Sequence, residues 1–138
     1  MGTHSLTFVH DGDNAKPFVC MCRQMDGYPS GHGHGLALQQ FLKPIRMING
    51  IGSDSEHIAN GAGCLAAQMI AHFKDGPGGI YVYAPTTKDA WQEYEYHVHA
   101  DDQSGIKVKC FAVGKRKNLL FEGSVEAFWE FCNRKEGD

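Results

Sequence analysis

The chain has 138 residues, of which 42% are hydrophobic and 21% are charged, and its formal net charge is −3 with histidine neutral. This composition fits one folded domain and excludes a disordered, charge-rich protein. The longest apolar run is far shorter than the ~20 residues of a spanning helix, and the basic residues are scattered, so neither membrane nor nucleic acid is an expected partner.

The cysteines and the N-terminus bear on the compartment. No basic segment followed by an apolar one begins the chain, so export is not expected. The cysteines are odd in number and lie within apolar patterns, which is typical of small buried side chains and not of a disulfide framework. They are Cys20, Cys22, Cys64, Cys110 and Cys132. We therefore expect a cytoplasmic protein with free thiols.

The first half of the chain alternates between short strands and longer helical patterns. Residues 6–10 alternate in polarity and predict a strand, and residues 18–25 are apolar on both faces, which predicts a central strand. A helix follows, with apolar side chains at helical spacing, and Pro44 should end or kink it. Its apolar positions are Leu38, Phe41, Leu42 and Ile45. A loop is expected over residues 49–60.

Residues 61–73 are apolar almost all round, which predicts a helix buried on every side. Strands are predicted over residues 80–84, 94–99, 106–112 and 119–121. A turn at Asp101–Gly105 would pair Val98 with Val108, His97 with Lys109 and His99 with Lys107. Ser124 should cap a last helix with apolar side chains facing inward. These are Val125, Phe128, Trp129 and Cys132.

The predicted order of elements is ββ-α-α-ββββ-α. Strands joined by short turns indicate an α+β fold in which an antiparallel sheet of five to six strands carries the helices on one face. No repeat or linker interrupts the pattern. We therefore expect one globular domain over residues 1–138.

A glycine- and histidine-rich segment precedes the first predicted helix. Glycine amides at a helix N-terminus can bind an anion, and two histidines there could add charge or transfer protons. The candidate ligand-binding residues are Asp26, Tyr28, Gly31, His32, Gly33 and His34. A metal held by His32 and His34 is an alternative, although Cys20 and Cys22 on an extended strand are poorly placed to complete it. A plain surface loop is another, and no metal or cofactor is expected.

Three segments carry a resemblance to known sequences. Residues 26–33 (DGYPSGHG), 60–68 (NGAGCLAAQ) and 93–96 (EYEY) are similar to an uncharacterised family of phage and marine-metagenome proteins. The resemblance spans about residues 18–98. It implies a phage context, and hence the cytoplasm of an infected host, but no activity or mechanism.

Cys64 lies near the start of the second predicted helix, where the helix dipole favours a thiolate. His97 and His99 follow on one strand face, and Glu95 or Glu93 could orient an imidazole. This order resembles that of papain-like thiol hydrolases and amidases. The alternative interpretation is a cysteine packed for its size and an ordinary solvated sheet face.

Aromatic residues gather between residues 81 and 96: Tyr81, Tyr83, Trp91, Tyr94 and Tyr96. Residues 80–83 are apolar on both faces, so a homodimer would cover this strand if it lay at a sheet edge. The sequence thus favours a non-enzymatic, self-associating accessory or binding protein of phage type. A small thiol hydrolase using Cys64 with His97 or His99 is the alternative.

Overall fold

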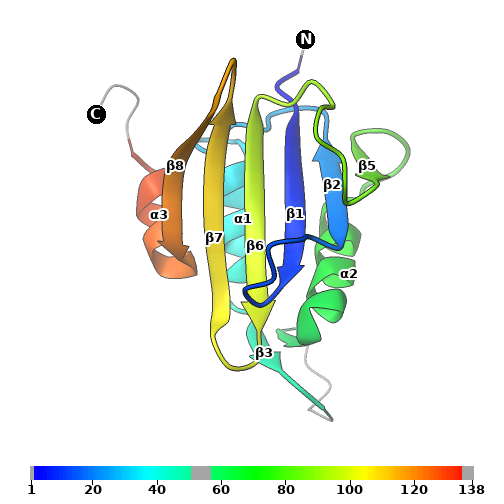
Figure 1. The fold of residues 1–138 in the computed structure, drawn as a ribbon, viewed down its shortest axis with the longest axis vertical. Coiled ribbons are helices and arrows are strands. Elements are labelled where there is room, and N and C mark those ends of the chain that lie inside the picture. The colour runs from blue at the N-terminus through cyan, green and yellow to red at the C-terminus, as the bar shows by residue number, and fades with distance from the viewer. Residues whose placement is uncertain (1, 51–56, 135–138) are drawn as a thin grey trace.

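A six-stranded sheet forms the centre of the computed structural model, which describes residues 2–50 and 57–134 (Figure 1). Its strands are β1 (Ser5–Asp11), β2 (Val19–Arg23), β5 (Ile80–Tyr83), β6 (Tyr94–Asp101), β7 (Gly105–Val113) and β8 (Lys117–Ser124). Their order across the sheet is β5-β2-β1-β6-β7-β8. Neighbouring strands are antiparallel except β1 and β6, which are parallel. The fold is α+β, as the sequence predicts.

The three helices of the described residues all cover one face of this sheet, and none of them lies on the other face (Figure 1). They are α1 (His34–Leu42), α2 (Gly61–Phe73) and α3 (Val125–Cys132). The Ser124 hydroxyl accepts a hydrogen bond from the Ala127 amide at 3.1 Å and caps α3, which confirms that prediction. α1 ends at Leu42, before Pro44, because proline cannot continue the hydrogen-bond ladder.

A second, two-stranded sheet was not predicted, and its strand β4 corrects the end of the loop expected over residues 49–60. β3 (Arg46–Ile48) and β4 (Ile58–Asn60) pair in parallel, and Met47 and Ala59, opposite one another, are both buried. Three-residue strands carry no readable alternation, so sequence pattern missed them. Residues 51–56 of the predicted loop lie outside the described residues.

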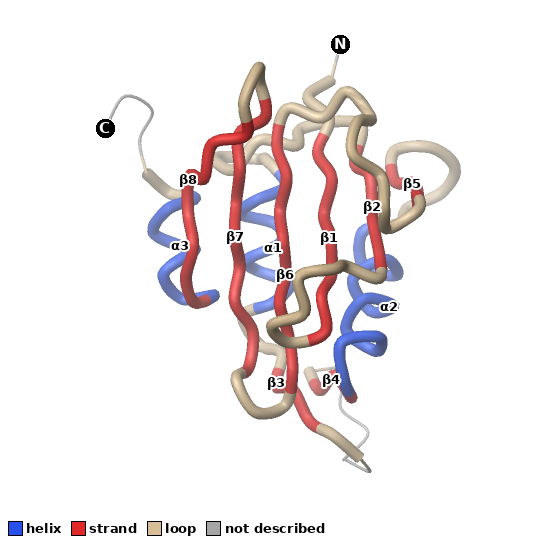
Figure 2. Tube along the Cα trace, viewed as in Figure 1, coloured by secondary structure: helices blue, strands red, loops and turns tan. Residues whose placement is uncertain are grey.

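The core lies between the sheet and the helices, and a smaller cluster lies on the other face of β1 and β2. Val9 and Met21 face the helices, whereas Leu6, Phe8, Cys20 and Cys22 form the smaller cluster, against which Ala90 packs. This second cluster explains why both strands are apolar on two faces. Two loops, residues 12–18 and 84–93, pass over that face (Figure 2).

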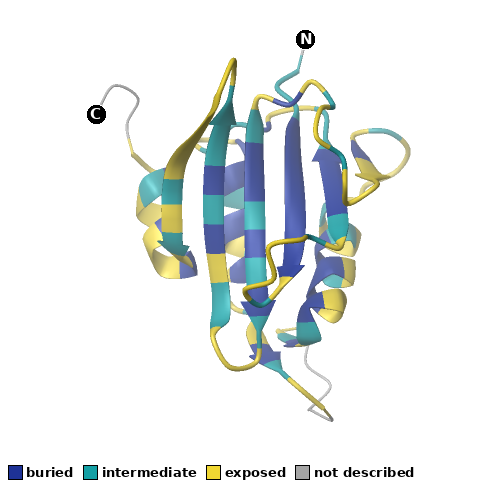
Figure 3. Cartoon of the chain, in the orientation of Figure 1, coloured by how far each residue is buried: buried dark blue, intermediate teal, exposed yellow. Residues whose placement is uncertain are grey.

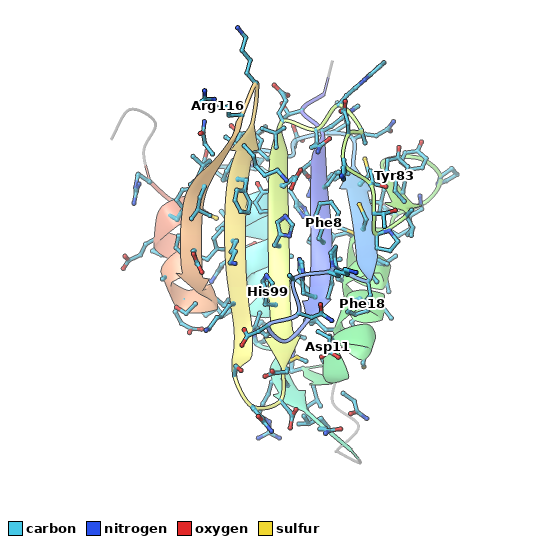
Figure 4. All side chains as sticks on the ribbon, viewed as in Figure 1. Phe8, Asp11, Phe18, Tyr83, His99 and Arg116 are labelled. Atoms are coloured by element: carbon cyan, nitrogen blue, oxygen red, sulfur yellow. The ribbon has the colours of Figure 1, made fainter. Side chains whose placement is uncertain are left out.

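The predicted register of β6 and β7 is confirmed. Val98 pairs with Val108, and His97 and His99 pair with Lys109 and Lys107. Since Tyr96, Val98 and Ala100 belong to the core on the helix side, the alternating residues of β6 face the other way. We call this helix-free side the open face, and Phe8 and His99 point out from it (Figure 4).

Two burial predictions were wrong. Residues 61–73 are buried on one side only, through Ala62, Leu65, Ala66 and Met69, and the outer side of α2 is exposed (Figure 3). The outer side looked apolar because it carries small side chains such as Gly63, Ala67 and Ala71, and these lose little by facing solvent, since the hydrophobic gain scales with the area buried. On α3, Trp129 is 48% exposed and does not join the core. In residues 2–50 and 57–134, no helix has the length and hydropathy needed to cross a membrane.

Candidate functional site

Polar side chains from three strands form a continuous hydrogen-bonded chain on the open face. Lys117 Nζ lies 2.9 Å from Glu95 Oε1, and the same oxygen lies 3.1 Å from His97 Nε2. His97 Nδ1 is 2.8 Å from His10 Nε2, and His10 Nδ1 is 2.9 Å from the Asn14 carbonyl oxygen. The parallel pairing of β1 with β6 brings His10 beside this polar face.

Burial and hydrogen bonding set the charges along this chain. Burial raises the pKa of Glu95, but hydrogen bonds from His97, Lys117 and Gln92 outweigh it and hold that pKa at about 2. Burial, helped by the nearby charge of His99, lowers the pKa of His10 to about 4. Burial also lowers the pKa of His99. Glu95 is therefore a carboxylate and His10 a neutral imidazole at neutral pH.

Aromatic rings enclose the imidazole of His97. Phe8 stacks on it with ring centroids 4.8 Å apart, and the Phe111 ring meets it edge to face at 5.4 Å. On the other side of His10, His99 stacks at 4.0 Å and lies within 2.9 Å of the Gly12 carbonyl oxygen through Nδ1. These contacts fix the orientation of all three imidazole rings.

A cavity of about 680 Å³ opens above this chain. Its lining residues come from the sheet and from the loops 12–18 and 84–93. Figure 2 shows these loops crossing the open face. The lining residues are Phe8, Lys16, Pro17, Pro85, Thr86, Thr87, Lys88, Glu95, His97 and Lys117. Its volume lies in the range of small-molecule sites.

The cavity is cationic although the chain as a whole is anionic. Three lysines, Lys16, Lys88 and Lys117, line it against one carboxylate, Glu95, whereas the chain carries a net charge of −3. Phe8 and two prolines supply apolar surface between these charges. Such a lining fits a small molecule that carries an anionic group on an apolar body.

The structure does not bring Cys64 together with the histidines. α2 packs on the helix side of the sheet, whereas Glu95, His97 and His99 belong to the open face. Cys64 is exposed, and its Sγ lies 3.4 Å from Gln68 Oε1. The interpretation of Cys64 as buried packing material is wrong, and the dyad of the thiol hydrolase is not assembled.

The glycine-histidine segment also differs from expectation. His34 is fully buried, with Nε2 2.9 Å from Thr7 Oγ1 and Nδ1 3.2 Å from Arg23 Nη1. Because Arg23 can only donate, His34 Nδ1 accepts and Nε2 donates to Thr7. Burial, followed by the charge of Arg23, lowers the pKa of His34 to about 3. His34 is therefore a neutral structural residue, while His32 is exposed.

The amides that precede and begin α1 bind carbonyl oxygens of their own loop. The amides of Gly33, His34, Gly35 and Leu36 donate to carbonyls of residues 26–30. A Cβ at Gly33 would overlap the Tyr28 carbonyl oxygen, and one at Gly35 would lie 2.6 Å from Pro29 Cα. These glycines thus permit close packing, and their amides do not form the expected anion site. The other predicted ligand contacts of this segment stay predictions: Asp26, Tyr28, Gly31 and His32.

Sequence reasoning missed two members of the open-face site. His10 continues the alternation of Leu6 and Phe8, but its partner strand lies more than 80 residues away. Lys117 was counted only among the scattered basic residues, although its ammonium reaches the nearly buried Glu95. The sequence signal for the site was the alternation Glu95, His97, His99, which was recognised.

Neither a metal-binding cluster nor a related protein indicates what the open-face site does. Within residues 2–50 and 57–134, no group of three or more histidine, cysteine, aspartate or glutamate side chains is arranged to hold a metal ion. Comparison of the chain with protein families, curated proteins and solved structures found no match. The open-face cavity is therefore the feature of the molecule that bears on its function.

Proposed function

We propose that this chain is a non-enzymatic binding protein whose open-face cavity holds a small molecule with an anionic group and an apolar body. The observation that carries the proposal is the cavity lining, in which three lysines surround a floor containing Phe8. The lysine ammonium groups supply the attraction for the anion, and the prolines and Phe8 supply contact for the apolar body.

The chemistry of the floor favours binding over catalysis. Both ring nitrogens of His97 are engaged, one with His10 and the other with Glu95. Both oxygens of Glu95 are engaged too, since Oε2 accepts from Gln92 Nε2 at 2.9 Å. A general acid or base needs a free position within hydrogen-bonding reach of the substrate. These groups instead hold one another in place.

The phage context, the cytoplasmic location and self-association complete the proposal. All five cysteines are free, which is compatible with a reducing compartment. β5 is an outer strand of the sheet, and three of its side chains, Tyr81, Val82 and Tyr83, are exposed hydrophobics. Exposed apolar edge strands pair readily with another chain. We therefore propose a homodimer formed through β5.

Titration with benzenesulfonate, followed by amide chemical shifts, tests the cavity. This probe carries one permanent negative charge on an aromatic ring. We expect saturable binding with shifts centred on Thr86, Thr87 and His97, and an affinity that falls as salt is added. Lys88→Glu should weaken binding roughly tenfold, because it reverses a charge at the rim.

Lys43→Glu is the matched control, since Lys43 is exposed directly after α1 and is not among the lining residues. It makes the same change in net charge and should leave the affinity nearly unchanged. Absence of saturable binding, or equal effects of the two substitutions, would refute the binding site.

A further inference from the structure

Three consecutive hydrogen bonds join the Asn14 carbonyl to the Glu95 carboxylate through two imidazole rings. They are His10 Nδ1 to Asn14 O at 2.9 Å, His10 Nε2 to His97 Nδ1 at 2.8 Å, and His97 Nε2 to Glu95 Oε1 at 3.1 Å. Each bond requires one hydrogen. A carbonyl oxygen has none to donate, so His10 Nδ1 must carry the first.

The last bond fixes a second hydrogen. Glu95 Oε1 also accepts from Lys117 Nζ at 2.9 Å, and Oε2 accepts from Gln92 Nε2 at 2.9 Å. Because donors occupy both oxygens, Glu95 is an ionised acceptor, and His97 Nε2 must carry the hydrogen. The hydrogen bond between His10 Nε2 and His97 Nδ1 needs a third hydrogen. Two neutral imidazoles carry only two hydrogens, so the pair holds one proton in excess.

The surroundings assign this proton to His97. Burial makes His10 a poor site for charge, with its pKa lowered to about 4. His97 instead has the Glu95 carboxylate at 3.1 Å and the face of Phe8 stacked on it, and both attract a cation.

Several lysines oppose the proton. Lys109 faces the pair from β7, and its Nζ lies 3.9 Å from Glu122 Oε2. His99 faces the pair from β6, but burial lowers its pKa and so weakens its opposition. Lys117 from β8 is paired with Glu95. Lys16 and Lys88 come from the loops over the cavity and are exposed to solvent, where their charges are screened. The groups that favour a proton on His97 contact it directly, whereas the opposing lysines are paired with carboxylates or solvated, so the proton is retained.

We propose that His10 and His97 hold one shared excess proton at neutral pH, and that anion binding in the open-face cavity is coupled to it. The proton on His97 balances the negative charge of Glu95 in the cavity floor, so the lysines above it are left to attract an anion. Linkage is reciprocal: a bound anion retains the proton, and loss of the proton weakens the anion's affinity. The ligand half of this inference rests on the proposed function, whereas the proton half rests on the three hydrogen bonds.

Ring-nitrogen NMR of the protein without ligand tests the proton directly. At pH 7.5 an ordinary histidine, with a pKa near ~6.5, is mostly neutral. We expect one histidine with both ring nitrogens protonated, identified as His97 by its loss in His97→Gln, and His10 as the Nδ1–H tautomer. A neutral His97 at this pH, or one equivalent of zinc between the rings, would overturn the shared proton.

Benzenesulfonate binding measured from pH 5.5 to pH 9 tests the coupling, because the charge of this probe is constant over that range. His10→Phe removes the acceptor that shares the proton, so its affinity should match that of the wild type at pH 5.5 and fall severalfold by pH 7.5. His32→Gln is the control, since His32 is exposed and takes no part in the three bonds. It should reproduce the wild-type profile.

Different results would refute the binding function of the cavity and the coupling of the shared proton to binding. Lack of binding at every pH would refute the cavity's function and with it the coupling, while the NMR result would still decide the shared proton. Binding with the same pH profile in the wild type and in His10→Phe would refute the coupling but leave the binding function standing.

Discussion

His34→Gln should make the protein less sensitive to acid. His34 is fully buried between Thr7 and Arg23, and a proton on Nδ1 would face the Arg23 guanidinium at 3.2 Å. Glutamine can also accept from Arg23 and donate to Thr7, but it does not titrate in this range. The substitution therefore removes the ionisation while preserving polar groups at the site.

The magnitude follows from linkage between protonation and folding. The pKa of His34 is about 3 in the folded protein and near 6.5 in the unfolded chain. Between these values the unfolded chain binds more protons, so stability is complete above pH 6.5 and is lost as the pH falls. At pH 4.5 the unfolded pKa lies two units above the pH, which corresponds to a loss of about 3 kcal/mol from this residue.

Urea unfolding of the wild type and of His34→Gln at pH 8 and at pH 4.5 measures this loss. Carboxylates and His10 titrate in both proteins, so they cancel in the comparison. The free energy of unfolding should fall by about 3 kcal/mol less in His34→Gln than in the wild type. Equal losses in the two proteins would show that His34 is protonated within the fold, and would refute the argument from burial.

Gly33→Ala should lower the free energy of unfolding by ~2 kcal/mol, because its Cβ would overlap the Tyr28 carbonyl oxygen. Gly63→Ala lies on the exposed side of α2, where a Cβ would meet nothing within 4 Å, and should instead raise the free energy of unfolding by up to about 1 kcal/mol. Urea unfolding that finds Gly33→Ala more stable than Gly63→Ala would contradict both predictions. A maleimide should label Cys64 in the native protein and the buried cysteines only after unfolding, and mass spectrometry that finds Cys64 protected would contradict its exposure. Val82→Lys should shift a dimer formed through β5 to monomer in sedimentation equilibrium, and a dimer that persists would lie elsewhere.

Local pattern was sufficient for much of the fold. The alternation in residues 94–112 predicted the β6–β7 register pair by pair, because a slip of one residue would place charges in the core. Ser124 was recognisable as a cap, because capping depends on residues a few positions apart. The α+β class followed from the order of such locally determined elements.

Tertiary structure alone decided which sides of the elements are covered and which distant residues meet. Residues 61–73 looked buried on every side, but only contact with the sheet shows that Cys64 faces solvent. The parallel pairing of β1 with β6 places His10 against His97, 87 residues further along the chain. No local periodicity encodes such a pairing, because it depends on how the whole sheet is assembled. The sequence therefore revealed the strand that carries His97 and His99, whereas the fold determined that this strand lies beneath a cationic cavity, on the side of the sheet opposite α2 and Cys64.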